Sequence, residues 1–271
     1  MRYPWPEAPE PGDYLEVADG VLWIRLPLPM ALDHVNVYAL DDGADGWTIV
    51  DTGMHSRKSV ALWENLLAGA LGGRPVHRVV VTHHHPDHVG NAGWFQSTRG
   101  AELVTSRTSW LFARMLLLDE QPEMVPETVA FFQSAGMDAD VLTKRRAERP
   151  FNYADIVAPM PLGFRRVAQG DEITMGGRRW AVHMGNGHAP EHCTFWSLED
   201  DLVLSGDQIL SSISPNLGVY ATEPEADPVG AWLEACERLS TLAEARHLVL
   251  GGHKLPGDPT LQYAICDPAT G

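Results

Sequence analysis

The stretch THHHPDHVG, residues 82–90, places four histidines and an aspartate within nine positions. It follows a β-branched apolar run, which predicts a buried strand that ends in this loop. Alternate residues of an extended segment face the same side, so His83 and His85 can reach one point. Asp87 and His88 follow Pro86, which bends the chain, so they can reach a second point nearby. Imidazole and carboxylate groups suit zinc, and also iron or manganese. Burying four of them together without a metal would cost several kcal/mol.

Three further ligand types stand where other apolar segments end. His188 lies in the glycine-rich turn GNGHAPEH, Asp207 follows the run LVLSG, and His253 follows LVLGG. Each residue alone is more often structural than functional. Together with the histidine-rich loop they complete seven candidate ligands, which is enough for two metal ions.

This set resembles the metallo-β-lactamase superfamily, in particular its dinuclear hydrolases of the glyoxalase II, or hydroxyacylglutathione-hydrolase-like, type. The family motif THxHxDHxG is matched by residues 82–90, and the resemblance covers roughly residues 20–255. It implies an α/β fold, the four-layer αβ/βα sandwich, in which two sheets lie between outer helices.

The resemblance also implies which side chain serves which ion. Two divalent metal ions are expected, of which zinc is favoured and iron or manganese are alternatives. A supporting aspartate is matched by Asp51 in the segment IVDTG. The first ion would be bound by His83, His85 and His188, and the second by Asp87, His88 and His253, with Asp207 bridging the two.

A dinuclear site of this kind predicts a hydrolase. Two close cations lower the pKa of a shared water from 15.7 toward about 7, so hydroxide becomes available as the nucleophile at neutral pH. Asp87 and Asp207 are then the candidate catalytic carboxylates, and Asp87 or a water would protonate the leaving group. We expect Ser205 to orient the turn before Asp207, because no serine nucleophile is required.

Several reactions remain open at this stage. The leading hypothesis is hydrolysis of a thioester, ester or lactone bond in a small metabolite. The alternative is a phosphodiesterase or ribonuclease that uses the same two ions. A β-lactamase is disfavoured because the true β-lactamases lack the bridging carboxylate of Asp207. A lactonase is weakened because no tyrosine follows Asp207 until Tyr220. A non-catalytic sensor is disfavoured because all seven ligands are present.

The remaining histidines carry weaker expectations. His84 occupies the variable position of the motif and is expected to point away from the metals. Three others lie near motif segments and are candidates for lining the pocket, namely His34, His55 and His192. Three lie in predicted strands and are expected to be structural, namely His77, His183 and His247.

The elements that must position these residues follow from hydrophobic periodicity. Helices are predicted at 56–71, shortly after Gly90, and at 227–245 with Asp227 as its N-cap. The coarse order gives two halves, each a group of strands followed by helices. Strands are predicted at 21–28, 34–40, 47–51, 77–82, 101–105, 164–169, 171–175, 178–184, 193–198, 202–206 and 247–252.

We expect one domain over residues 1–271, with a proline-rich extended arm at 1–14 and a helical insertion at 106–163. The insertion is rich in methionine and aromatic residues. It is a candidate lid or substrate wall that would suit a partly hydrophobic acyl group, and it also suits a segment that completes the core. An anionic substrate tail could be received by Arg145, Arg146, Arg165 and Arg166, although a solvated run of charges is the plainer interpretation.

Net charge, the length of apolar runs and the number of cysteines limit the kinds of partner that we expect this protein to bind. The net charge of −16 repels phosphate backbones, so we expect a small-molecule substrate and no nucleic acid. No apolar run approaches the roughly 20 residues that span a bilayer, and residues 1–14 do not read as a signal peptide, so we expect no membrane and a cytoplasmic protein. The three cysteines predict no disulfide. After His253 the chain lacks a helical pattern, so a homodimer partner is a candidate cover for the pocket.

Overall fold

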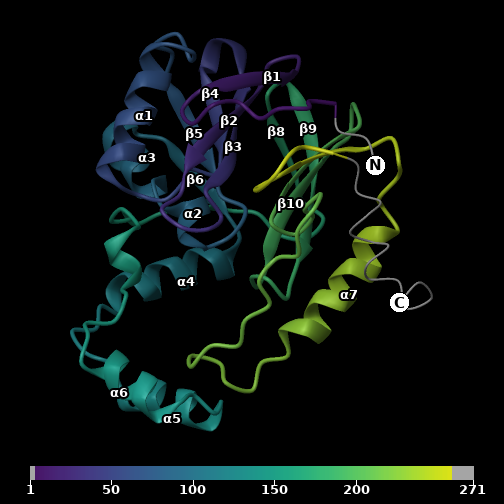
Figure 1. Ribbon diagram of the computed structural model, residues 1–271. Coiled ribbons are helices and arrows are strands. Elements are labelled where there is room, and N and C mark those ends of the chain that lie inside the picture. The colour runs from purple at the N-terminus through teal and green to yellow at the C-terminus, as the bar shows by residue number, and fades with distance from the viewer. Residues whose placement is uncertain (1–3, 258–271) are drawn as a thin grey trace.

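The computed structural model describes residues 4–257, and in it the chain forms two mixed sheets that pack face to face (Figure 1). The first sheet has the strand order β1-β2-β3-β4-β5-β6-β7 and the second has the order β12-β11-β10-β9-β8. The strands of the first sheet are β1 (Tyr14–Ala18), β2 (Val21–Pro27), β3 (His34–Asp41), β4 (Trp47–Val50), β5 (Val76–Val80), β6 (Glu102–Thr105) and β7 (Arg165–Arg166). Those of the second are β8 (Glu172–Met175), β9 (Arg178–Gly185), β10 (His192–Ser197), β11 (Leu202–Gly206) and β12 (Leu248–Gly251).

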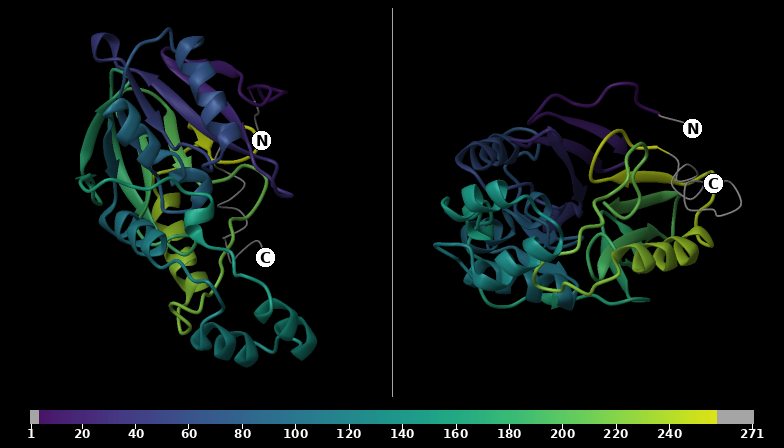
Figure 2. Two further views of the ribbon diagram at one scale, coloured as in Figure 1. Left: turned by 90° about the vertical axis from the view of Figure 1, so that its left-hand side faces the viewer. Right: turned by 60° about the horizontal axis from the view of Figure 1, so that its bottom comes forward.

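Helices cover the two outer faces of this pair of sheets. On the first sheet lie α1 (Arg57–Ala68) and α3 (Ala92–Arg99), and on the second lies α7 (Pro228–Ser240) (Figures 1 and 2). The predicted four-layer αβ/βα sandwich is therefore confirmed. Short 3-10 turns occur at Gly43–Asp45 and Tyr153–Asp155.

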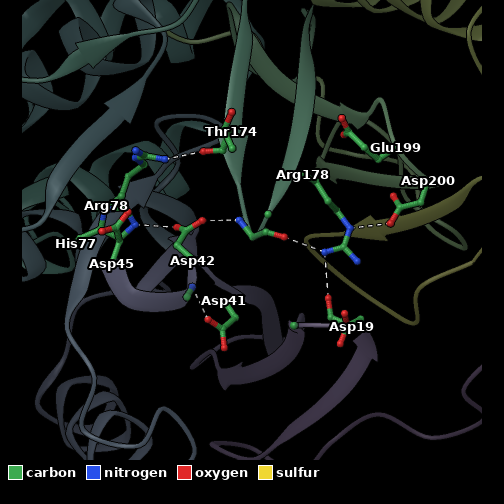
Figure 3. A pocket seen from close by; sticks show the side chains of 14 residues that line it. Asp19, Asp41, Asp42, Asp45, His77, Arg78, Thr174, Arg178, Glu199 and Asp200 are labelled. Carbon is green, nitrogen blue, oxygen red and sulfur yellow. Dashed lines mark hydrogen bonds and ion pairs between the residues drawn. The ribbon is translucent and has the colours of Figure 1, made fainter.

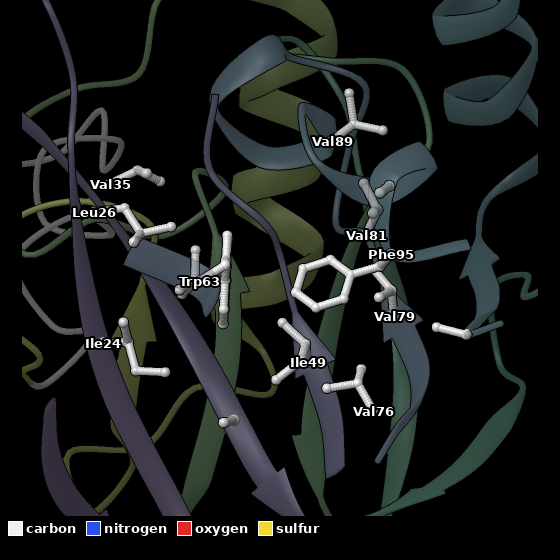
Figure 4. Close-up of a cluster of buried hydrophobic side chains, with 14 of the residues drawn as sticks. Ile24, Leu26, Val35, Ile49, Trp63, Val76, Val79, Val81, Val89 and Phe95 are labelled. Carbon is white, nitrogen blue, oxygen red and sulfur yellow. The ribbon is translucent and has the colours of Figure 1, made fainter. Parts of the chain in front are cut away.

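Alternation along the central strands explains why both faces of the first sheet are buried. Ile49 and Val79 face the helices, where the rings of Trp63 and Phe95 meet edge to face at 5.0 Å (Figure 4). Their neighbours face the second sheet and pack there with its apolar residues, as the two-residue period of a strand requires. The core between the sheets includes Trp23, Val50, Val80, Trp180, Phe195, Leu204 and Leu250.

The parallel part of the first sheet sets the position of the site. Strands β4, β5, β6 and β7 are parallel neighbours, so their carboxyl ends lie at one edge. Strands β11 and β12 of the second sheet are also parallel and end at that edge. The loops that follow Val50, Val80, Gly206 and Gly251 therefore meet, although they are far apart in sequence.

Two of the strand predictions were inaccurate. The arm predicted at 1–14 gives way to an edge strand, β1, which begins at Tyr14 and pairs antiparallel with β2. The strand predicted at 164–169 shrinks to Arg165–Arg166, because only these residues pair with β6. In addition, the bend after Pro86 is one turn of helix, α2 (Pro86–Val89), with proline at its first position, where a missing N–H costs nothing.

The helical insertion divides into two parts. Helix α4 (Arg107–Leu118) and residues 153–160 pack on the core through Ala113, Tyr153 and Met160. Helices α5 (Pro126–Ser134) and α6 (Ala139–Arg146) form a hairpin that extends beyond the sandwich (Figures 1 and 2). Helix α5 has no buried residue. The part of the insertion that completes the core is thus separate from the part that can form a wall.

Among the described residues, no helix is both long and apolar enough to cross a membrane. The C-terminal segment on which the expectation of a covering partner rested lies largely outside the described residues.

We predict that Trp63→Ala lowers the free energy of unfolding by about 3–5 kcal/mol, because the side chain is fully buried against Phe95. Its indole N–H also donates to the Thr52 carbonyl over 2.8 Å, and that hydrogen bond is lost. Urea titration in excess chelator measures the change. Leu162→Ala is the matched control, since Leu162 is 79% exposed, and its effect should stay within about 0.5 kcal/mol. Equal effects of the two substitutions would contradict the proposed packing.

Candidate metal centre

The histidine-rich loop leaves β5 and is fixed at its first residue. The Thr82 amide donates to Asp51 Oδ1 over 2.8 Å, and the Thr82 hydroxyl donates to Asp51 Oδ2 over 2.9 Å. Asp51 itself has a positive φ of 59°, a conformation that aspartate tolerates better than most residues. This turn directly after β4 aims its carboxylate at the loop after β5.

Three imidazole nitrogens converge in a first group. His83 Nε2 lies 3.0 Å from His85 Nδ1 and 3.2 Å from His188 Nε2, and the last two atoms are 2.9 Å apart. Tetrahedral zinc with Zn–N bonds near 2.0–2.1 Å separates its nitrogen ligands by about 3.3 Å. The three atoms are therefore close to the spacing that a single ion requires.

A second group combines a carboxylate with two imidazoles. His253 Nε2 lies 3.4 Å from Asp87 Oδ2, and His88 Nε2 lies 3.7 Å from the same oxygen. Their ligand atoms fall within 4.8 Å of one another. These three residues come from helix α2 and from the end of β12, so both sheets contribute.

Asp207 lies between the two groups. Its Oδ2 is 3.4 Å from His188 Nε2 and 3.2 Å from His253 Nε2, while its Oδ1 is 3.3 Å from His88 Nε2. One carboxylate thus faces ligands of both groups. The structure brings all seven predicted residues together.

Hydrogen bonds from outside the cluster determine which ring nitrogen faces it. The Nδ1 atoms of His88, His188 and His253 pair with Asp51 Oδ2, the Asn216 carbonyl and the His34 carbonyl, at 2.7, 2.9 and 2.8 Å. Each Nδ1 must donate, which leaves each Nε2 facing the cluster, where it can bind a cation.

Asp51 and Thr82 fix His83 in the same way. The Thr82 hydroxyl donates its proton to Asp51, so at 3.0 Å it accepts from His83 Nδ1–H. His83 Nε2 then carries a lone pair. Asp51 therefore contacts His88 directly and His83 through Thr82.

The residues present fit divalent cations. Within the described chain, His88 Nε2 and Asp207 Oδ1 are buried without a hydrogen-bond partner, and they face each other. Such orphaned polar atoms are costly unless something binds them. Gly252 leaves room there, since a Cβ at that position would overlap both Asp207 Oδ1 and His88 Cε1.

Electrostatics agree with that fit. Burial lowers the pKa of His83 and His85 well below its usual value, so both stay neutral, the form that binds metals. Burial also acts to lower the pKa of His88, but the carboxylates of Asp207 and Asp87 outweigh it and raise the pKa well above its usual value. The same carboxylates raise the pKa of His253 to about 10 against burial. A bound cation would take the place of these protons.

The histidines outside the seven candidate ligands either pack behind the metal centre or make contacts away from it. His192 was expected as a pocket residue, but it is fully buried behind the cluster. Its ring stacks on His83 at 4.4 Å, and its Nε2 accepts from the Asp207 amide at 3.1 Å.

The other two histidines expected near the pocket lie elsewhere. His34 accepts from the Lys254 amide and borders a separate cavity, while His55 pairs with Asn91. The structural expectation for His77, His183 and His247 fits their contacts with Asp42, Gln169 and the Glu244 amide.

His84 is not one of the candidate ligands, but its ring remains next to them. Its ring packs on Phe112 at 5.0 Å and borders a cavity of about 260 Å³ together with His85 and His188. The Tyr153 hydroxyl donates to the His84 carbonyl. The expectation that His84 points away was therefore incomplete, because α4 turns its ring into a wall of that cavity.

Ser205 behaves as expected, since its hydroxyl donates to the Ile209 carbonyl over 2.7 Å and closes the turn around Asp207. Asn216 and Tyr153 were missed. Asn216 accepts from His188 through its backbone carbonyl, and the Tyr153 hydroxyl donates to the backbone carbonyl of His84. Contacts with backbone atoms such as these cannot be predicted from the pattern of residue types. Of the four arginines considered for an anionic tail, Arg145 borders a cavity near the insertion, and Arg165 approaches Glu102 at 3.8 Å.

A larger cavity of about 930 Å³ lies at the opposite end of the strands (Figure 3). Two of its acidic residues are already engaged, as Asp42 binds His77 and the Gly176 amide, and Asp200 binds Arg178. None of the seven candidate ligands borders it. The chemistry therefore belongs to the smaller cavity beside His188.

Comparisons with known proteins agree with this geometry. A sequence profile described as the metallo-beta-lactamase superfamily matches residues 30–253. The chain belongs to the metallo-beta-lactamase superfamily. It is accordingly a metal-dependent hydrolase, as predicted.

Individual members of this superfamily are also similar to the chain. A probable metallo-hydrolase of Bacillus subtilis, YqjP, is 26% identical over 243 residues, which is 88% of this chain and 72% of that protein. A beta-lactamase domain protein from Burkholderia ambifaria is 37% identical with a TM-score of 0.85, covering 95% of this chain and 74% of the other. A metallo-beta-lactamase family protein from Thermus thermophilus, TTHA1429, is 28% identical with a TM-score of 0.76, covering 92% of this chain and 78% of the other.

We predict that Asp51→Asn weakens metal binding about 10- to 100-fold, because an amide cannot accept at once from Thr82 and His88 as the carboxylate does. Competition with a chromophoric chelator measures the affinity. Asp45→Asn is the matched control, since Asp45 is exposed at the other end of the sandwich. An affinity of Asp51→Asn equal to that of the control would show that Asp51 does not support the ligands.

Proposed function

We propose that the protein holds two divalent metal ions and hydrolyses a thioester, ester or lactone bond in a small metabolite. The observation that supports two ions most directly is the position of Asp207, whose two oxygens face ligands of both groups. We assign His83, His85 and His188 to one ion, Asp87, His88 and His253 to the other, and Asp207 to both. The five imidazoles and two carboxylates favour zinc, with iron or manganese as alternatives.

Bound at this site, the metal pair would supply hydroxide at neutral pH and a Lewis acid for the attacked oxygen. The chain supplies the rest. Asp87 is the more exposed of the two site carboxylates, with 18% of its side chain accessible, compared with 8% for Asp207. It can therefore take a proton from a water and return it to the leaving atom. Asp207 is held by its neighbours, so its role is to keep the two groups at a fixed separation.

The surroundings support a small carbonyl substrate. The cavity of about 260 Å³ beside His85 and His188 is small and is bordered by Phe112 and Tyr220 as well as by polar groups. The net charge of −16 disfavours a polyanionic substrate such as RNA, because approach to a negative surface is repelled. Phosphodiester hydrolysis remains the competing proposal.

We expect protein that carries metal to turn over at least one member of a panel of thioesters, esters and lactones, and to lose that activity completely with chelator. Zinc, iron or manganese added back should restore it. Leu162→Ala, which is far more exposed than any site residue, is a control that should behave as the unmodified protein. Turnover of a phosphodiester alone would contradict the carbonyl substrate. Activity that survives full removal of metal would contradict the dinuclear site itself.

A further inference from the structure

A second cavity, of about 670 Å³, opens beneath the helical insertion. Its walls come from α4, from the segment before α5, from α5 itself and from the segment after α6. We call it the insertion groove. Its apolar walls are formed mainly by Leu116, Met124, Val125, Phe132, Phe151 and Tyr153. Phe151 is 67% exposed, and α5 has no buried residue, so much of this apolar surface is accessible.

The insertion groove adjoins the cavity of the metal centre. Tyr220 borders both cavities. Phe112 borders the cavity of about 260 Å³ beside His85 and His188, which we call the metal-side cavity, and Leu116 borders the groove. Phe112 and Leu116 are one turn apart on the same face of α4. Figures 1 and 2 show the loop between β11 and α7, which carries Tyr220, lying beside the α5–α6 hairpin.

Three hydrogen bonds tie this junction to the candidate ligands. The Tyr153 hydroxyl donates to the backbone carbonyl of His84, which lies between His83 and His85. The Asn216 side-chain amide donates to the Tyr220 hydroxyl over 3.2 Å, and the Asn216 carbonyl accepts from His188 Nδ1. The walls of the groove are thus held in a fixed relation to the first group of ligands.

The charges of the groove disfavour an anionic chain end. Three acids and two arginines border it, which are Asp119, Glu123, Glu148, Arg145 and Arg149. Arg149 is engaged by Asp155 and Glu120 at 2.9–3.1 Å, and the Arg145 guanidinium lies 5.7 Å from the centre of the Phe132 ring. No excess of positive charge remains for a carboxylate or phosphate, so the accessible apolar surface decides what binds.

We propose that the insertion groove binds the acyl part of the substrate, and that this part is a neutral apolar chain of medium length. The scissile bond then lies in the metal-side cavity, and Tyr220 stands at the boundary between the two. This inference rests on the proposed carbonyl hydrolase and names its substrate class. The binding experiment below does not depend on turnover.

Thioesters of N-acetylcysteamine with acyl chains of two, four, six, eight and ten carbons provide the first test. Burial of each added methylene should raise kcat/KM about fourfold until the groove is filled. A profile that is flat, or that falls from the acetyl compound onward, would overturn the inference and leave the hydrolase intact.

Two substitutions on the groove surface sharpen this test. Thr128→Trp fills the groove from a half-buried position on α5, and Phe151→Asp places a charge at an exposed position. Neither change disturbs a fully buried side chain. Each should lower the ratio of kcat/KM for the octanoyl compound to that for the acetyl compound at least tenfold. Leu162→Asp introduces the same charge at an exposed apolar residue elsewhere and should leave the ratio unchanged.

Binding of octanamide, which is neutral and has no thioester to hydrolyse, separates the two claims. Calorimetry on the full chain, stripped of metal by chelator, should detect binding to the unmodified protein and to Leu162→Asp, and weaker binding to Thr128→Trp. Octanamide binding without turnover of any carbonyl compound would support the groove and contradict the proposed function. Turnover of the acetyl thioester without octanamide binding would overturn the groove and support the function.

Discussion

The candidate metal centre depends on seven ionisable side chains that lie close together at one end of the two packed sheets. The Asp207 carboxylate is the point at which they meet, because its oxygens lie 3.2–3.4 Å from imidazoles of both candidate metal groups. In a site with so little access to water, like charges repel and unpaired polar atoms are costly. The carboxylates attract positive charge strongly, as the raised pKa values of His88 and His253 indicate, and His88 Nε2 and Asp207 Oδ1 face each other at 3.3 Å without a hydrogen bond. A bound divalent cation would interact favourably with both atoms.

The fold makes this concentration of charge possible. Each sheet ends several of its strands at the same edge, and the apolar core between the sheets fixes the two edges relative to each other. Ligands from β5 and β12 are therefore placed by rigid elements, while the short loops only aim them. Supporting contacts extend the rigidity outward, since Asp51 fixes His88 and Thr82, and the backbone carbonyls of His34 and Asn216 fix two more imidazoles. The insertion adds a wall at this edge without altering the sandwich.

Residue type and spacing were sufficient to single out the seven candidate ligands, because polar residues directly after apolar strands carry a strong signal. Asp51 and the four layers followed only from the family resemblance of the histidine-rich motif. The edge strand β1 and the short β7 were missed or overextended, because edge pairing depends on which backbone lies alongside rather than on side-chain period. The location of His192 behind His83, and of His84 against Phe112, depends on packing between distant segments. The same is true of the insertion groove, where Tyr220 joins walls that lie within residues 116–153.

The most direct test of the central claim is anomalous diffraction from crystals of the protein purified without added metal, recorded above and below the absorption edge of the metal that elemental analysis finds. The account predicts two anomalous peaks about 3.5–4 Å apart, one on each side of the Asp207 carboxylate. One peak should lie among His83, His85 and His188, and the other among Asp87, His88 and His253. A single peak, or ions bound only away from these side chains after zinc, iron or manganese has been supplied, would contradict the shared-carboxylate centre.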